Sequence, residues 1–362
     1  MRPPPLFHTV VIAGVGLIGG SVGLGVRQRF LAERVVGLDR DPAALEAALG
    51  LGAIDEIRLH PGDWLMEAGL IVLAPPARAV APLAESLLPF VGPEAILTDV
   101  GSVKAEVVRR LAAARFVGGH PMAGSERVGV QHASAALLEN AVWVLTPAET
   151  TDPSALASVR RFVEALGSKP IEVAPEQHDR LVAAVSHLPY LAAVALTQLV
   201  AEDKDRDLMM LLAAGGFRDL TRVASGNPTM SRDMVAANRE AIRETLGAFR
   251  QRIEALERLL DEPDALLERA EAAKHSRDAI PIVRRSLLPA RFEVVIAVPD
   301  RPGELAKITR ALGDAEVNVK DIEVLAIREA GGAIRLAFES NEELKRATAA
   351  LTGAGYEARG RG

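Results

Sequence analysis

The histidine in "FVGGHPMAGSE" (residues 116–126) is a candidate for acid–base chemistry. His120 follows an apolar run and stands among glycines, in a chain with only seven histidines. A neutral imidazole titrates near physiological pH, so it can accept a hydroxyl proton as a carbinol carbon loses hydride. We therefore predict that His120 is a catalytic base, and that the glycines around it let the reacting molecules approach the backbone. The alternative is a loop histidine satisfied by its surroundings.

A second polar loop, "TDVGSVK", follows the preceding apolar run and carries Asp99, Ser102 and Lys104. Ligands of open parallel sheets bind outside the carboxyl ends of the strands, where both loops are expected to lie. Ser102 is therefore a candidate site residue. The alternative is that Ser102 caps a helix that begins at Val103.

A third polar cluster lies further along the chain, in an apolar region. It consists of "VSHLPY" and "AGGFRDLTRVASGNP", with Ser186, His187, Tyr190, Gly215, Gly216, Arg218, Asp219, Arg222 and Asn227. The guanidinium of Arg222 fits a substrate carboxylate in bidentate geometry. The alternative is a surface arginine paired with Asp219.

A dinucleotide-binding motif opens the first helix of the chain. Gly14, Gly16 and Gly19 form G-x-G-x-x-G between a strand and a helix, and Asp39 ends the second strand, 20 residues after Gly19. The glycines permit a tight turn, approach of a pyrophosphate, and close packing of the helix, while the aspartate accepts hydrogen bonds from the ribose. Because its carboxylate repels a 2′-phosphate, we predict NAD rather than NADP, although the neighbouring Arg40 leaves some room for NADP. The predicted cofactor-binding residues are Gly14, Gly16, Leu17, Ile18, Gly19, Asp39, Arg40 and Ser102.

The elements that must position these residues indicate three domains. Residues 1–173 alternate short apolar runs with helical stretches, which predicts a Rossmann-type doubly wound parallel sheet. Residues 174–285 predict an all-helical substrate and dimerisation domain, with Pro189 as a kink and a charged, proline-containing linker from about residue 261. Residues 286–362 have the order βαββαβ of a ferredoxin-like unit.

One face of the helical domain indicates an interface between two copies of the chain. A late helix carries apolar residues spaced by threes and fours, namely Ile242, Leu246, Phe249, Ile253, Leu256 and Leu260. We favour a homodimer interface, and the alternative is a purely intramolecular core.

Composition excludes several classes of function. The net charge of −6 argues against nucleic acid and anionic membranes as partners. The absence of cysteine excludes disulfides and thiolate chemistry, and it suits a cytoplasmic protein. The glycines of "TVVIAGVGLIGG" argue against a secretory signal, and prolines and charges interrupt each candidate membrane span.

The motifs "GVGLIGGS", "TDVGSVK", "GGHPMAGSE", "SHLPY" and "GGFRDLTRVASGNPTMSRD" resemble, in order and spacing, those of prephenate or arogenate dehydrogenases of tyrosine biosynthesis. The resemblance covers residues 8 to about 260. It implies NAD-dependent oxidative decarboxylation of prephenate to 4-hydroxyphenylpyruvate. In this reaction His120 would take the C4 hydroxyl proton, and Ser102 would share the hydroxyl and orient the histidine. The reaction would need no metal. The substrate-binding residues it implies are Arg222, Asp219, His187, Tyr190, Glu126 and Gly215.

One position departs from the family pattern. Many members have a second histidine where this chain has Tyr190, which leaves the choice between prephenate and arogenate open.

Two further classes of protein share parts of this layout. A β-hydroxyacid dehydrogenase has the same Rossmann and helical domains, but it would use a lysine in the helical domain, where this chain has His187, Arg218 and Arg222. A regulator that senses NAD and an amino acid would need a DNA-binding element, and the sequence shows no helix-turn-helix pattern and no basic face.

The C-terminal unit, with "DRPGELAKI" and "VNV", resembles an ACT domain. The resemblance implies an amino-acid effector bound at Asp300, Gly303 and Asn318, and we predict feedback inhibition by tyrosine. The alternative is a purely structural role in dimerisation.

Overall fold

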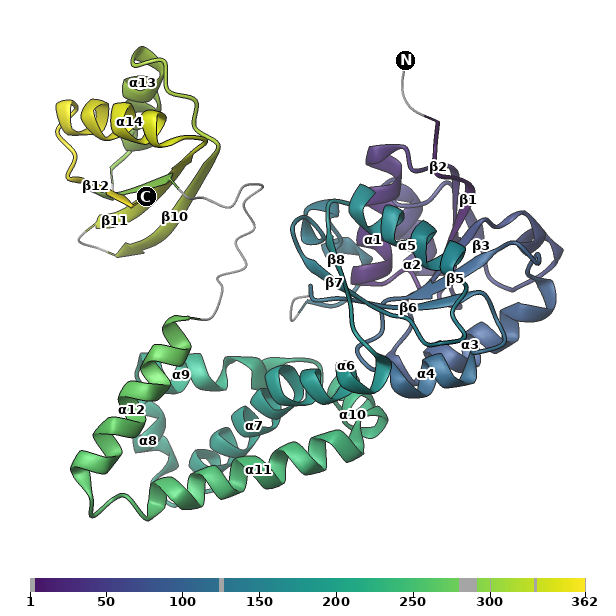
Figure 1. Ribbon diagram of the computed structural model, residues 1–362, viewed down its shortest axis with the longest axis horizontal. Coiled ribbons are helices and arrows are strands. Elements are labelled where there is room, and N and C mark those ends of the chain that lie inside the picture. The colour runs from purple at the N-terminus through teal and green to yellow at the C-terminus, as the bar shows by residue number, and fades with distance from the viewer. Residues whose placement is uncertain (1–3, 124–126, 280–291, 300, 329–330, 362) are drawn as a thin grey trace. The chain divides into compact units, whose positions relative to one another are not determined.

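The computed structural model describes residues 4–123, 127–279, 292–299, 301–328 and 331–361 (Figure 1). The chain divides into two compact units, Met1–Pro281 and Ile282–Gly362.

An eight-stranded sheet forms the centre of the first unit, in the order β3-β2-β1-β4-β5-β6-β7-β8 (Figure 1). The strands are β1 (Phe7–Ala13), β2 (Ala32–Leu38), β3 (Glu56–Arg58), β4 (Leu70–Leu73), β5 (Ile96–Asp99), β6 (Phe116–Pro121), β7 (Val142–Thr146) and β8 (Lys169–Glu172). The chain leaves β1 toward β2 on one side and later returns to β4 on the other. This reversal confirms the predicted doubly wound topology.

Helices cover both faces of this sheet. They are α1 (Leu17–Arg29), α2 (Pro42–Gly50), α3 (Val80–Leu87), α4 (Ala105–Arg110) and α5 (Pro153–Ala165), with short 3₁₀ turns η1 (Asp63–Glu67), η2 (Ala77–Ala79), η3 (Leu88–Phe90), η4 (Val130–His132) and η5 (Ala135–Leu137). Alternate residues of β1 enter two separate cores, Val10 and Ile12 on one face and Val11 and Ala13 on the other. Such burial on both faces explains the continuous apolar runs of the sequence.

Two features of the sheet differ from the prediction. β7 runs antiparallel to β6, with His120 opposite Val144. A parallel neighbour requires a long crossover, usually a helix, whereas the described part of the 122–141 connection contains only η4 and η5. The short edge strand β3 was also not predicted, because three residues carry too little pattern.

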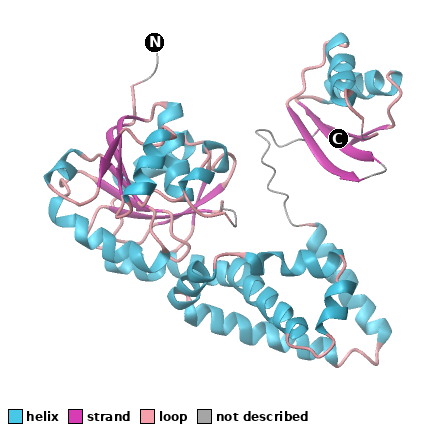
Figure 2. Cartoon of the chain, turned by 180° about the vertical axis from the view of Figure 1, so that it is seen from behind, coloured by secondary structure: helices cyan, strands magenta, loops and turns pink. Residues whose placement is uncertain are grey.

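The remainder of the first unit is helical (Figure 2). Its helices are α6 (Pro175–Val182), η6 (Ala183–His187), α7 (Leu188–Ala201), α8 (Arg206–Leu212), α9 (Gly215–Thr221), η7 (Arg222–Ser225), α10 (Pro228–Ala237), α11 (Arg239–Glu257) and α12 (Pro263–Asp278). The all-helical prediction is confirmed, and α12 occupies much of the segment predicted as a linker.

α6, η6 and α7 form one continuous helix, Pro175–Ala201. η6 is a π-helical turn directly before Pro189. A proline in a helix clashes with the carbonyl four residues earlier, and a wider turn relieves that clash.

By length and composition alone the helix Pro175–Ala201 could cross a membrane, and only 22% of its apolar window is buried. The sequence pattern instead predicts that prolines and charges interrupt every apolar segment long enough to cross a membrane.

The predicted apolar face of α11 is mostly exposed in the single chain. Ile242 is buried, whereas Ile253 is 50% exposed and Leu260, just beyond the helix, is 71% exposed. An intramolecular core therefore does not account for this face.

The second unit has the predicted ferredoxin-like order. Its elements are β9 (Phe292–Val298), α13 (Glu304–Asp314), β10 (Asp321–Arg328), β11 (Gly331–Phe338), α14 (Asn341–Gly353) and β12 (Ala358–Arg361). The strands form an antiparallel sheet in the order β10-β11-β9-β12. Its apolar core includes Val294 and Ile296 of β9, Leu336 of β11 and Leu351 of α14.

Candidate functional site

Each of the three glycines of the β1–α1 turn is suited to its position for a different physical reason. Gly14 has φ +103°, and a Cβ there would lie 2.7 Å from the carbonyl of Ala74. A Cβ on Gly19 would lie 2.0 Å from the carbonyl oxygen of Gly14, so this glycine lets α1 pack against the turn. A Cβ on Gly16 would meet no described heavy atom within 4 Å beyond its own chain neighbours. That open position suits the approach of a pyrophosphate.

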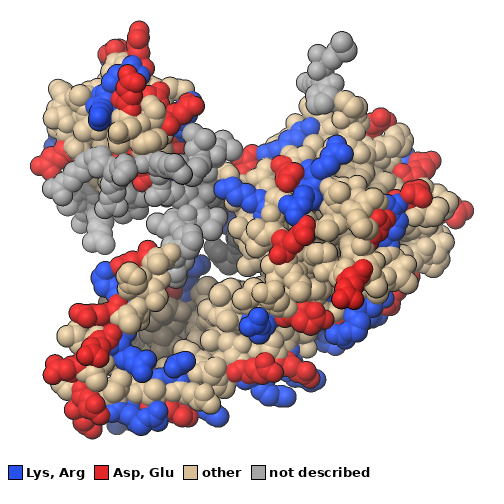
Figure 3. All heavy atoms as spheres, viewed as in Figure 1, with Lys and Arg blue, Asp and Glu red and all other residues tan. Residues whose placement is uncertain are grey.

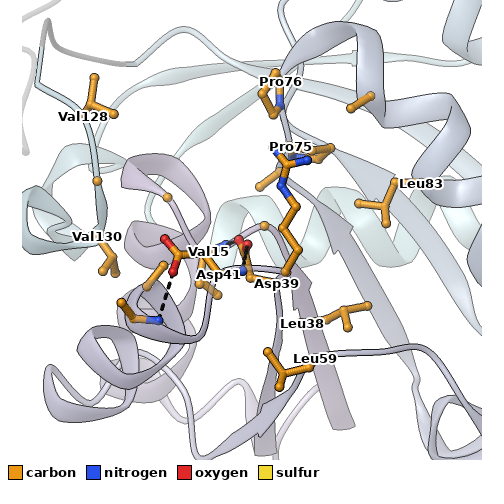
Figure 4. Close-up of a pocket in the computed structure, with 18 of the residues that line it drawn as sticks. Val15, Leu38, Asp39, Asp41, Leu59, Pro75, Pro76, Leu83, Val128 and Val130 are labelled. Carbon is orange, nitrogen blue, oxygen red and sulfur yellow. Dashed lines mark hydrogen bonds between the residues drawn. The ribbon is translucent and has the colours of Figure 1, made fainter.

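Asp39 is tied to this turn by its carboxylate. Its Oδ2 accepts a hydrogen bond from the backbone N–H of Val15 at 3.0 Å, and its Oδ1 accepts one from Asp41 at 3.0 Å. Asp39 and the exposed Arg40 line a cavity of about 1190 Å³ with Gly14 and Gly16 (Figure 4). These residues fit a dinucleotide, with Gly16 at the pyrophosphate and Asp39 at the ribose. Leu17 and Ile18 begin α1 behind the turn.

A buried ion pair joins β5 to the loop before α4. Lys104 and Asp99 are both fully buried and in contact. Lys104 Nζ also donates to the carbonyl of Gly119 at 2.9 Å, and Asp99 Oδ1 accepts the N–H of Gly119 at 2.9 Å. Lys104 and Asp99 therefore form hydrogen bonds with the carbonyl and the N–H of Gly119, the residue directly before His120. Burial lowers the pKa of Lys104, against the opposing charge and hydrogen bond of Asp99.

His120 lies at the end of β6 and is partly buried. Its Nδ1 lies 2.9 Å from Nε2 of His178, and Nδ1 of His178 lies 2.8 Å from Oδ1 of Asp179. Burial lowers the pKa of His120 well below its usual value, and the proximity of His178, Lys104 and His187 acts in the same direction because each disfavours a positive charge on His120. At neutral pH His120 is therefore a neutral imidazole that can accept a proton.

Asp179 also caps a helix of the neighbouring domain. Its Oδ1 accepts the N–H of Lys104 at 2.7 Å and its Oδ2 the N–H of Ala105 at 2.9 Å. α4 begins at Ala105, so the interpretation of Ser102 as the cap of a helix beginning at Val103 is wrong. Ser102 is partly exposed in the same loop, and within the described ranges its hydroxyl has no hydrogen-bond partner.

The glycines before His120 do not clear space for substrate and nicotinamide, which corrects the prediction. A Cβ on Gly118 would lie 2.2 Å from Oγ1 of Thr146. A Cβ on Gly119 would lie 2.5 Å from the carbonyl oxygen of Asp99 and 2.8 Å from Nε1 of Trp143. The protein's own atoms fill the space, so these glycines allow β5, β6 and β7 to pack closely.

His187 and Tyr190 lie on the helix that also carries His178. His187 is 1% exposed, and its Nδ1 accepts a hydrogen bond of 3.2 Å from Asn238, which also donates to the carbonyl of Asp179 at 2.8 Å. Burial lowers the pKa of His187 to about 4. Tyr190 is partly exposed in α7.

Other predicted site residues are exposed in the single chain or lie outside the described residues. Gly215, Asp219 and Arg222 are exposed on α9 and η7, and within the described ranges Arg222 and Asp219 form no ion pair with each other. The alternative of a surface pair is therefore not observed. Glu126 and Asp300 lie outside the described residues.

The effector loop of the second unit ends at Gly303, which has φ +89° and precedes α13. The carboxylate of Glu304 accepts hydrogen bonds from Lys307 at 2.7 Å and from the hydroxyl of Tyr356 at 2.8 Å, and these bonds lower its pKa. Asn318 is exposed and lies three residues before β10, which begins at Asp321.

His178, Asp179 and Asn238 were not singled out from the sequence. His178 and Asp179 stand in the first two turns of an otherwise ordinary amphipathic helix. The only signal was an adjacent histidine and aspartate that α6 brings to the ends of β5 and β6.

Comparison with known proteins gives matches across the chain. Residues 22–172 match the model "Prephenate dehydrogenase, nucleotide-binding domain", residues 174–269 match "Prephenate dehydrogenase, dimerization domain", and residues 292–355 match "ACT domain". A prephenate dehydrogenase of Bacillus subtilis is 33% identical over 349 residues, 94% of each chain. A cyclohexadienyl dehydrogenase of Zymomonas mobilis is 30% identical over 76% of this chain and 97% of that protein.

Solved structures match about three quarters of the chain. The prephenate dehydrogenase of Aquifex aeolicus, in complex with hydroxyphenyl propionate and NAD⁺, is 32% identical, with a TM-score of 0.73 over 76% of this chain and 99% of that one. The arogenate dehydrogenase of Synechocystis is 35% identical, with a TM-score of 0.67 over 75% of this chain and 99% of that one.

Proposed function

The chain belongs to the prephenate dehydrogenase family, and we propose that it converts prephenate and NAD⁺ into 4-hydroxyphenylpyruvate, carbon dioxide and NADH in tyrosine biosynthesis. The observation that carries the proposal is the position of His120. It is a neutral, partly buried imidazole at the carboxyl edge of a sheet whose β1–α1 turn fits a dinucleotide.

His120 accepts the proton of the C4 hydroxyl as C4 loses hydride, for which bound NAD⁺ supplies the acceptor. The bond from C1 to the carboxylate breaks, its electron pair enters the ring, and carbon dioxide leaves. The ring becomes aromatic, and His120 returns its proton to the phenolate oxygen. Because aromatisation makes the step strongly favourable, orientation and one proton acceptor are the main requirements.

Further residues complete the proposed site. Ser102 shares the substrate hydroxyl with His120 and lies beside the nicotinamide. Arg222 holds a substrate carboxylate, Asp219 and Gly215 of the preceding helix α9 contribute to the same substrate site, and Glu126 is a further substrate-binding residue. His187 matches the family motif, and its burial favours a role in shaping the pocket wall.

The side chain of the substrate distinguishes prephenate, a keto acid, from arogenate, an amino acid. Tyr190 can donate a hydrogen bond but carries no positive charge at neutral pH, and relatives include both an arogenate and a cyclohexadienyl dehydrogenase. The test is NADH formation with prephenate and with arogenate, each with NAD⁺ and NADP⁺. The proposal predicts the highest kcat/KM for prephenate with NAD⁺. A higher value with arogenate would reassign the substrate.

A homodimer is the proposed assembly. The matched dimerization model spans the helices whose apolar residues are exposed, including Leu199 at 71% and Leu211 at 81%. A second copy would cover these side chains, and this explains the apolar helix Pro175–Ala201 without a membrane. Light scattering should give twice the chain mass.

Both signs of charge are interspersed on the face shown in Figure 3, which suits a soluble cytoplasmic enzyme.

The second unit is proposed to bind tyrosine as feedback inhibitor, near Asp300, Gly303 and Asn318. The N–H groups in the first turn of α13 and the positive end of its helix dipole suit the carboxylate of an amino acid. Truncation after residue 285 should abolish tyrosine inhibition. Unchanged inhibition would instead indicate product-like competition at the active site.

A further inference from the structure

We propose that His178 is a positioning residue that holds His120 in the tautomer whose unprotonated nitrogen is Nε2. His178 does so by linking His120 to Asp179 through two hydrogen bonds. The inference rests on the proposed function, because it assigns which nitrogen of His120 accepts the substrate proton.

The direction of the chain of hydrogen bonds is set at Asp179. Each of its carboxylate oxygens accepts a backbone N–H, from Lys104 and from Ala105. A carboxylate in this environment is an acceptor only. The ring nitrogen that lies 2.8 Å from Oδ1, Nδ1 of His178, must therefore carry a hydrogen.

The donor and the acceptor in the hydrogen bond between His178 and His120 can be assigned in the same way. In the proposed arrangement His178 is a neutral imidazole. With its hydrogen on Nδ1 it has a lone pair on Nε2, which can only accept. Nδ1 of His120, 2.9 Å away, must therefore be the donor. A neutral His120 with hydrogen on Nδ1 has its lone pair on Nε2. Because His178 is 1% exposed, bulk water does not compete for this bond.

The arrangement also stabilises the charged state of His120. When Nε2 accepts the substrate proton, Nδ1 keeps its hydrogen bond to His178, and the negative charge of Asp179 lies at the end of the chain. Among the described residues, the other titratable groups close to His120 are Lys104, which is paired with Asp99, and the buried His187. Burial alone opposes a buried cation, so Asp179 supplies the compensating charge.

The elements that build the link come from both halves of the first unit. His178 and Asp179 belong to α6, His120 belongs to β6, and the carboxylate of Asp179 caps α4. Asn238, directly before α11, donates to the carbonyl of Asp179 and adds a third anchor. The orientation of the imidazole therefore depends on the helical half being docked on the sheet.

The direct test is the tautomer of His120 in the full-length protein with ¹⁵N-labelled histidine, read from long-range ¹H–¹⁵N spectra. The His120→Asn variant assigns the signals by their loss. We expect hydrogen on Nδ1 and a bare Nε2 in the wild type. Hydrogen on Nε2 would overturn the proposal. This measurement needs no substrate, so it can succeed or fail independently of the proposed function.

Kinetics supply the second arm. His178→Leu removes the acceptor, and we expect kcat to fall roughly 10- to 100-fold, as for outer-shell partners of functional histidines, with KM for NAD⁺ unchanged. His178→Gln offers an amide oxygen to Nδ1 of His120 and should recover most of kcat, which a purely structural role would not predict. The exposed His275→Leu is the matched control. Wild-type kcat in His178→Leu would contradict the role, whereas no turnover by the wild type with prephenate or arogenate would contradict the proposed function.

Discussion

The buried ammonium of Lys104 donates a hydrogen bond to the carbonyl oxygen of Gly119 at 2.9 Å, one residue before His120. Asp99 accepts the N–H of the same glycine at 2.9 Å. A charge pair thus fixes the strand end that carries the imidazole. Removing one member of a buried pair leaves the other charge without compensation.

We predict that Lys104→Met lowers the free energy of unfolding by about 3–5 kcal/mol. Arg160→Met, which breaks the half-exposed pair of Arg160 with Glu172, is the matched control and should cost less than about 1 kcal/mol. Denaturant unfolding of both variants measures the difference. Equal losses would show that the buried pair does not stabilise the strand end.

The glycines before His120 give a second prediction. Gly119→Ala places a Cβ 2.5 Å from a backbone oxygen, so we expect a loss of roughly 1–3 kcal/mol from overpacking. Gly216→Ala meets no described atom within 4 Å and should leave stability unchanged or raise it. If Gly119→Ala instead raised KM for prephenate at full stability, the glycine would be making room for substrate after all.

Cofactor choice depends on Asp39. Its carboxylate is held by the N–H groups of Val15 and Asp41 beside the cavity, where it would accept ribose hydrogen bonds and repel a 2′-phosphate. Asp39→Ser should lower kcat/KM for NAD⁺ roughly 10- to 100-fold, as expected for lost hydrogen bonds to a charged group. It should also raise kcat/KM for NADP⁺. An unchanged ratio of the two values would place the discriminating contact elsewhere.

Acid should destabilise the fold through His187. Its folded-state pKa of about 4 lies below the ordinary value of 6.5, so the unfolded chain takes up the proton first as the pH falls. The stability is fully present above pH 6.5 and is lost between pH 6.5 and 4, by about 3 kcal/mol in total. His187→Gln should reduce this loss in unfolding measurements across that range. The exposed His275→Gln should not. A loss of equal size in His187→Gln would assign the acid sensitivity to other groups.

The sequence allowed the nucleotide site to be predicted because its determinants are local. The spacing of Gly14, Gly16 and Gly19 sets one turn, and Asp39 directly follows the strand beside it. The links of His120 to His178 and of Lys104 to Asp179 join residues 58 and 75 positions apart. No local pattern encodes such contacts. The packing of Gly119 was misjudged for the same reason, because Trp143 comes from an antiparallel strand whose direction the sequence did not reveal.

The central claim is that His120 is the proton acceptor in oxidation of prephenate by NAD⁺. It is tested most directly by steady-state kinetics and NAD⁺ binding of His120→Asn beside the wild type. The account predicts a kcat lower by about 10²–10⁴-fold, the usual contribution of a general base, with NAD⁺ affinity nearly unchanged. A variant that turns over prephenate at the wild-type rate would contradict it.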